Sequence, residues 1–382
     1  MNLAISLPTQ RIHRIAVSVF FFIAGITFAS WASRIPDIKN TLHLSEAGLG
    51  TVLLALPAGL MASLPLSGWL VSKYGSRKMI LAGAILYPAT LVLLGLSTTI
   101  WQLVGVLFLF GLWGNLINIA MNTQAVGVEN LYGRSIMASF HGLWSLAAFT
   151  GALVGSILIS ANISPFIHFL LICISTVGLV VVFYKRTLPE DGADEGSANF
   201  ALPDKHILLL GLIGFCSMFC EGAMADWSGV YFQNVVEAPK ALMTLGYVAF
   251  TGSMATGRFL GDWLVMKIGM KKMLQWSGTL ISTGLCIGIF FPHIFPATLG
   301  FLLVGFGVSS VVPLVYSLAG KSTTMAPGLA LAAVSSVSFL GFLLGPPIIG
   351  FIAELTNLQW SFGFVAVLGL GTVLLSGKAK VV

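Results

Sequence analysis

The stretch Ser67-Gly-Trp-Leu-Val-Ser-Lys-Tyr-Gly-Ser-Arg-Lys78 is a short basic turn between two apolar runs, each long enough to cross a membrane. It recurs 194 positions later as Gly261-Asp-Trp-Leu-Val-Met-Lys-Ile-Gly-Met-Lys-Lys272. Seven of the twelve residues at 68–79 are identical in the second copy, and Arg77 faces Lys271, which keeps the charge. The offset is close to half of the 382 residues, so the sequence predicts two tandem copies of one unit.

The composition indicates that lipid surrounds this chain. Hydrophobic residues make up 57% and charged residues 8%, with a mean hydropathy of +0.96, whereas soluble domains carry about 25% charged residues. The 19 Lys and Arg lie almost wholly in short connections between apolar runs, so the net charge of +6 reflects membrane topology and does not indicate nucleic-acid binding. The four cysteines lack metal-site spacing, and neither a phosphate-binding loop nor a catalytic constellation occurs. We therefore expect no metal, no cofactor and no enzymatic activity.

Twelve runs reach the roughly 20 apolar residues that a membrane helix needs. They lie at about 12–33, 47–72, 79–98, 101–126, 136–160, 164–184, 205–232, 241–268, 272–292, 296–319, 327–354 and 358–376. The predicted fold is an all-α membrane protein with twelve transmembrane helices in two pseudo-symmetric six-helix bundles. The bundles are expected at 1–184 and 205–382, joined by a polar linker at 185–204.

The distribution of basic residues predicts the orientation. With the N-terminus in the cytoplasm, fifteen Lys and Arg fall in inside connections and three in outside connections, while Arg258 lies within a helix. We expect a multi-pass protein of the cell (inner) membrane with both termini in the cytoplasm.

The repeated turn resembles the signature of the major facilitator superfamily (MFS), Gly-x-x-x-Asp-Arg-x-Gly-Arg-Arg. Gly68, Lys73, Gly75 and Arg77 match that pattern, whereas Ser72 replaces the acidic residue. In the second copy Gly269 matches, and Met266 stands at the acidic position. The resemblance implies the MFS fold, monomeric secondary transport, and a gating or structural role for the matching residues.

Within the superfamily, the chain looks like the MosC-like group, which is itself similar to fucose permease. The resemblance rests on the stretch at 31–37, on Asn122 with Glu129, and on His141. Ala32 and Asn118 stand where the fucose permease pattern has membrane carboxylates, so the proton route of that relative does not carry over.

One face of the run at 101–126 and its extension is small and polar. Gly111, Asn115, Asn118, Asn122 and Glu129 fall within about 60° of one another at helical periodicity. A polar face is costly against lipid, so we expect it to face the bundle interior. The three asparagines are candidate substrate ligands; the alternative is hydrogen bonding that only ties helices together.

Aromatic rings near these polar positions could stack on a sugar-like solute. We single out four candidates, although membrane tryptophans more often form interfacial belts. They are Trp113, Trp144, Trp227 and Tyr316.

Several ionisable residues in apolar runs are candidates for proton coupling, because low dielectric favours the neutral form of a carboxyl group. Glu221 is the first candidate by depth, and Asp226 is placed as an outer gate or helix-end residue. Glu129 and His141 could form a titratable pair. The alternative for each is a buried structural hydrogen bond. Arg258 and Asp262 are spaced to pair on one helix face, and we expect that pair to hold a gate shut.

These observations predict a secondary active transporter that moves a small polar solute, such as a sugar or polyol derivative, by alternating access with proton symport. The expected partners are the lipid bilayer, the solute and protons. Two alternatives stay open: an exporter of metabolites or drugs, and a non-transporting membrane receptor with the same fold.

Overall fold

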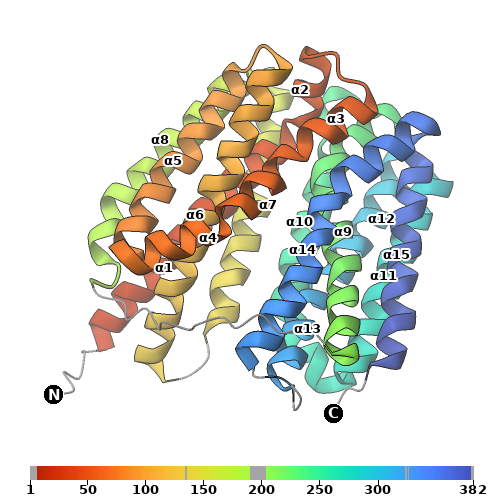
Figure 1. Cartoon of the computed structure of the whole chain (residues 1–382). Helices are drawn as coiled ribbons and strands as arrows, with labels where there is room; N and C mark the ends of the chain where they lie inside the picture. The colour runs from red at the N-terminus through yellow and green to blue at the C-terminus, as the bar shows by residue number, and fades with distance from the viewer. Residues whose placement is uncertain (1–6, 134–135, 190–203, 323–324, 326, 380–382) are drawn as a thin grey trace. The chain divides into compact units, whose positions relative to one another are not determined.

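The computed structural model describes residues 7–133, 136–189, 204–322, 325 and 327–379. These residues form helices, turns and bends, with no β-strand among them. The prediction of an all-α membrane protein is confirmed. The helices of the first half (Figure 1) are α1 (Leu7–Ser33), α2 (Ile35–Thr41), α3 (Glu46–Leu53), α4 (Ala55–Tyr74), α5 (Ser76–Leu96), α6 (Ile100–Tyr132), α7 (Met137–Ser160) and α8 (Pro165–Phe183). Those of the second half are α9 (Lys205–Asn234), α10 (Leu245–Ile268), α11 (Met270–Phe290), α12 (Ile294–Val308), α13 (Val311–Gly320), α14 (Pro327–Leu355) and α15 (Leu358–Lys378).

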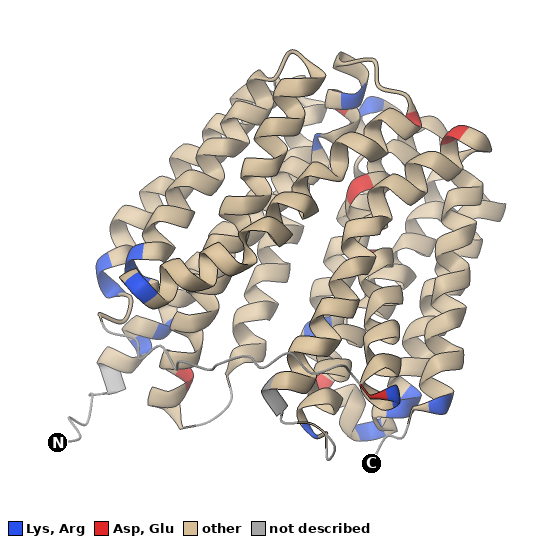
Figure 2. Cartoon of the chain, viewed as in Figure 1, with Lys and Arg blue, Asp and Glu red and all other residues tan. Residues whose placement is uncertain are grey.

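Eleven of the described helical segments are long and apolar enough to cross a membrane. α10 occupies the place of the expected eighth span but is not among them, because Arg258, Asp262 and Lys267 reduce its apolar character. Large apolar side chains are exposed along these helices, including Trp101, Leu355 and Phe295. Figure 2 shows that Lys and Arg gather near helix ends, and that the middle of the helices is almost free of charge. This arrangement suits a lipid environment.

The chain divides into two compact units that do not follow chain order strictly. Unit 1 comprises residues 1–34 and 55–196, and unit 2 comprises residues 35–54 and 197–382. α2 and α3 therefore belong with the second unit, whereas the sequence predicted them within 1–184. Most of the predicted linker lies outside the described residues. Its first part does not: Thr187 and Leu188 are buried, and the Gln124 side chain of α6 bonds both backbone groups of Leu188.

The repeat seen in the sequence is also a repeat of backbone geometry. Gly75 and Gly269 adopt φ values of 83° and 82°, in the region that favours glycine, directly before α5 and α11. The Lys73 ammonium lies 4.6 Å from the centre of the Trp69 ring, and Lys267 lies 4.0 Å from that of Trp263.

Helix packing repeats with the same offset. In unit 1, α1 packs against α7 and α4 against α6; in unit 2, the equivalent pairs are α9 with α14 and α10 with α12. A Cβ added to Gly111 would lie 2.0 Å from the Leu56 carbonyl oxygen, and one added to Gly305 would lie 2.1 Å from that of Phe250. Both residues of the second pair stand 194 positions after those of the first. The same close helix crossing thus occurs in each unit, where only glycine lets the backbones approach.

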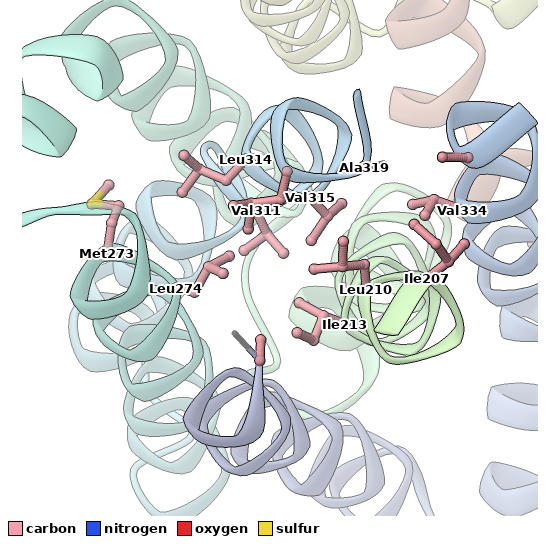
Figure 3. Packing of buried hydrophobic residues seen from close by; sticks show 13 residues of the cluster. Ile207, Leu210, Ile213, Met273, Leu274, Val311, Leu314, Val315, Ala319 and Val334 are labelled. Carbon is pink, nitrogen blue, oxygen red and sulfur yellow. The ribbon is translucent and has the colours of Figure 1, made fainter. Parts of the chain in front are cut away.

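The apolar core of unit 2 lies at the N-terminal end of α9. Ile207, Leu210 and Ile213 of α9 pack there with Val311 and Val315 of α13, and side chains of α11 and α14 complete the cluster (Figure 3). This core fixes α13 beside α9, which matters for the polar groups further along both helices.

α3 crosses α14 at very short range within unit 2. A Cβ on Gly50 would lie 2.6 Å from the Pro346 carbonyl oxygen, and one on Gly350 would lie 2.6 Å from that of Glu46. Polar contacts flank the crossing: Lys39 pairs with Glu46 at 3.1 Å, and Glu354 accepts from the Ala47 N–H at 3.2 Å. These contacts explain why residues 35–54 cluster with unit 2.

Candidate functional site

The amide face of α6 contains both free and committed polar groups. Asn122 Nδ2 donates to the Asn118 carbonyl oxygen at 2.8 Å and to Asn118 Oδ1 at 3.1 Å, which fixes both side chains. Asn118 is exposed and Asn122 half-buried. Asn115 is buried, and its Nδ2 has no hydrogen-bond partner in the described parts of the chain. An unsatisfied buried amide costs about 1–3 kcal/mol, so this face offers hydrogen-bonding capacity that the protein does not use.

The other candidates of unit 1 surround this face unevenly. Gly111 lies at the crossing of α6 with α4, where its missing Cβ lets the backbones approach. Trp113 and Trp144 are half-buried, with the Trp144 ring 6.1 Å from that of Phe28. Both rings keep accessible surface on which a solute could stack.

Glu129 lies where α6 ends and caps the next helix. Its Oε2 accepts from the backbone N–H groups of Ile136 and Met137 at 2.7 and 2.8 Å, so the carboxylate neutralises the start of α7. His141 is exposed, with its ring edge-on to Phe21 at 5.3 Å. A structural role accounts for Glu129, and the Glu129–His141 titratable pair stays a prediction.

An ion pair inside unit 2 joins two residues that the sequence did not connect. Glu221 of α9 and Arg258 of α10 approach to 3.4 Å between Oε1 and Nη2. Their side chains are only 19% and 17% exposed. Taking both charges out of water is costly, and the attraction between them offsets part of that cost.

Tyr316 completes this cluster from a third helix. It lies on α13, with its hydroxyl near the Ser335 side chain of α14 and close enough to Glu221 for an electrostatic interaction. Four helices of one unit therefore bring a carboxylate, a guanidinium and two hydroxyls together. Three of these four residues, Glu221, Arg258 and Tyr316, were predicted as site residues in separate roles.

Asp226 and Trp227 lie about one and a half turns beyond Glu221 and are buried. The Trp227 side chain is 0% exposed, and its Nε1 has no hydrogen-bond partner among the described residues. In this conformation the Trp227 ring offers no face to a solute. Its predicted stacking role therefore requires the side chains around α9 to move away from the ring.

The expected partner of Arg258 was wrong. Arg258 reaches across to Glu221, while Asp262 is exposed and makes no ion pair within the described part of the chain. The physical reason is burial: the largely buried guanidinium needs a carboxylate at its own depth, whereas an exposed carboxylate gains little from pairing.

Among the repeated-turn residues, Arg77 donates to the Lys185 carbonyl oxygen at 3.1 Å, which ties the turn to the start of the linker.

Sequence reasoning missed a buried cation in unit 1. Arg34 was counted in an outer connection, yet it is 1% exposed, and its Nε donates to His168 Nδ1 at 3.1 Å. Its position directly after α1 made it resemble a loop residue. Its partner His168 lies four positions after Ser164, the N-cap of α8.

Comparison with known proteins places this chain in a family. The family model described as Major Facilitator Superfamily matches residues 15–326. The chain belongs to the Major Facilitator Superfamily. It is therefore a multi-pass membrane transporter, as the repeated turn and its MFS resemblance predicted.

Two curated relatives match nearly the whole length of this chain. An uncharacterized MFS-type transporter of Yersinia pestis is 36% identical over 367 residues, which cover 96% of this chain and 95% of that protein. Membrane protein MosC of Rhizobium meliloti is 32% identical over 368 residues, covering 95% and 89%. The second match confirms the predicted MosC-like resemblance.

A solved structure of the same architecture supports the fold. A mutant form of the nucleoside transporter NupG superposes with a TM-score of 0.78 over 96% of this chain and 99% of that one. The sequence identity is 13%, so this likeness concerns the fold alone.

Proposed function

We propose that this MFS protein carries a small polar solute across the cell membrane by alternating access, driven by proton symport. The observation that carries the proposal is the Glu221–Arg258 ion pair, whose largely buried charges approach to 3.4 Å between α9 and α10. Both termini are proposed to lie in the cytoplasm and the protein to work as a monomer, on the distribution of Lys and Arg and on the family.

The ion pair suits proton coupling because its stability depends on the charge of Glu221. Protonation of this carboxylate removes the charge that Arg258 contacts, and α9 and α10 then lose an electrostatic tie. Tyr316 beside the pair can donate to the carboxylate or to a solute. Proton binding thereby changes the relative stability of two conformations, which is what coupling requires.

The amide face of α6 supports a polar, uncharged solute. Asn118 and Asn122 are oriented by their mutual hydrogen bond, and Asn115 has an unused donor. Carboxamides both donate and accept, as hydroxyl groups do, so a polyhydroxylated solute matches them. Trp113 and Trp144 add surfaces on which the apolar faces of a sugar ring would stack.

The test begins with a thermal-shift screen of purified protein against sugars, polyols, amino acids and drugs. The solute that stabilises the protein is then used in proteoliposomes with an inward proton gradient. We expect Glu221→Gln to abolish uphill accumulation and to leave counterflow exchange intact. Asp262→Asn is the matched control, because this exposed carboxylate on α10 should be dispensable. Uphill accumulation by Glu221→Gln at the wild-type rate would reject the coupling role.

The amide face has its own test. Asn118→Leu should weaken solute binding by about tenfold while leaving the melting temperature within a few degrees, because the side chain is exposed and its loss removes only the hydrogen bond from Asn122. A drop in melting temperature with unchanged affinity would assign the face to helix packing.

A further inference from the structure

Unit 1 contains a pocket that none of the proposed transport residues line. It has a volume of about 850 Å³ and lies between α1, α6 and α7 near the start of α1. Pockets for small molecules are typically about 300–1,000 Å³. The size therefore suits a ligand with the dimensions of a metabolite.

Two guanidinium groups stand at one end of the pocket. Arg14 is held in place, because its Nη2 donates to Ser139 Oγ at 3.3 Å and its guanidinium lies 5.5 Å from the centre of the Tyr132 ring. Arg11 is exposed and makes no hydrogen bond or ion pair within the described residues. One fixed and one free guanidinium form a receptor for a carboxylate, phosphate or sulfonate group.

Most of the remaining lining is apolar, with Gln10, Ser18 and Tyr132 as its polar members. Ile15 and Phe22 of α1 and Leu143 of α7 line it beyond the arginines. From Arg14 to Phe22 the helix rises by about 12 Å. A fully hydrated anion would leave this apolar surface uncovered, whereas an anion with an apolar body of about 12 Å would cover it.

We infer that this pocket binds an amphipathic organic anion, with its charged group at Arg11 and Arg14 and its apolar body along α1 toward Phe22. Two sources share this chemistry: a water-soluble organic anion and an anionic membrane lipid. The inference does not depend on the proposed proton coupling, since none of its residues belongs to the Glu221 cluster.

The first arm uses 4-phenylbutyrate and its uncharged analogue 4-phenylbutanol, measured by scintillation proximity binding to the full-length protein in detergent. We expect the anion to bind at least about tenfold more tightly than the alcohol, because a charge-assisted pair is worth a kcal/mol or more. Arg11→Gln should erase that preference. Lys78→Gln removes the same charge from an exposed site outside the pocket and should keep it.

The second arm uses native mass spectrometry with phosphatidylglycerol and phosphatidylcholine of identical acyl chains. Retention of phosphatidylglycerol that depends on Arg11, with no binding of phenylbutyrate, identifies a lipid as the occupant; the reverse identifies a soluble anion. Either result supports the proposal that this pocket binds an amphipathic anion. If neither anion shows Arg11-dependent binding, or if Lys78→Gln weakens binding as much as Arg11→Gln, the inference is overturned. Gel filtration verifies that the variants stay folded, and Ile15→Gln, which keeps both charges, should weaken phenylbutyrate by several-fold.

Discussion

Replacing Glu221 and Arg258 by glutamine, singly and together, measures how strongly the two residues depend on each other. Two unit charges 3.4 Å apart attract by about 5 kcal/mol at an effective dielectric constant of about 20. Desolvation and loss of side-chain freedom offset most of this attraction. Exposed pairs contribute about 1 kcal/mol or less, whereas removing one partner of a fully buried pair costs about 3–5 kcal/mol.

The side chains are 19% and 17% exposed, which puts this pair between those limits. We expect each single substitution to lower the unfolding free energy by about 2 kcal/mol, because it removes the ion pair while the other charge stays largely buried. The double variant should lose about 2.5 kcal/mol, since neither charge of the pair remains. The coupling energy is then about 1.5 kcal/mol.

The assay is unfolding in mixed micelles, followed by circular dichroism, on the three variants and on Asp262→Asn. The control should stay within about 0.5 kcal/mol of wild type, as surface changes usually do. If the double variant loses the full sum of about 4 kcal/mol, the residues act independently. The ion pair could not then serve as the tie that protonation releases.

Two further predictions concern glycines with matched controls in unit 1. Gly111→Ala should lower the melting temperature. A Cβ 2.0 Å from the Leu56 carbonyl oxygen forces α4 and α6 apart, at a cost of about 1–3 kcal/mol. Gly105→Ala on the same helix meets no atom within 4 Å, so it should raise the melting temperature through a gain in helix propensity of up to about 1 kcal/mol. Equal shifts for both variants would contradict the close crossing. Gly75→Ala should destabilise the protein by about 1–2 kcal/mol, because its φ of 83° is strained for alanine. Gly68 has a helical backbone and open space around it, so Gly68→Ala should be neutral or stabilising. Thermal unfolding followed by tryptophan fluorescence distinguishes the two variants.

The architecture was predictable because it follows from local chemistry repeated along the chain. Apolar length fixes the helices, and the identity between Gly75 and Gly269 signals a backbone position that needs glycine. The 194-residue repeat also relates positions that lie outside the repeated basic turn. Gly111 and Gly305 were not aligned by any run of identity, yet both make the same crossing with the residue 55 positions before them.

Side-chain partners across helices were not predictable in the same way. Helical periodicity says which residues share a face of one helix, so it offered Asp262 as the partner of Arg258. The actual partner lies 37 positions earlier on another helix, and only the packing of α9 against α10 decides that contact. Residues 35–54 show the same limit, since their docking on α14 depends on the approach of Gly50 to Gly350.

Comparison of the two copies suggests how the work is divided between them. Tyr316 and Ser335 stand 194 positions after Asn122 and His141, so two positions of the repeat carry polar groups in both units. The equivalents of Glu221 and Arg258 in the first copy are Thr27 and Leu64, which cannot form an ion pair.

A duplicated scaffold supplies the same helix crossings twice, and what differs between the copies must carry the asymmetric steps of transport. An uncharged amide face occurs in the first copy and an ionisable pair in the second. We therefore expect substitutions on α6 to change which solute is recognised, and substitutions at Glu221 or Arg258 to change how transport responds to the proton gradient. Transport assays at several external pH values separate the two effects. If an α6 variant such as Asn122→Ala shifted the pH dependence while its solute affinity stayed constant, this division of roles would be wrong.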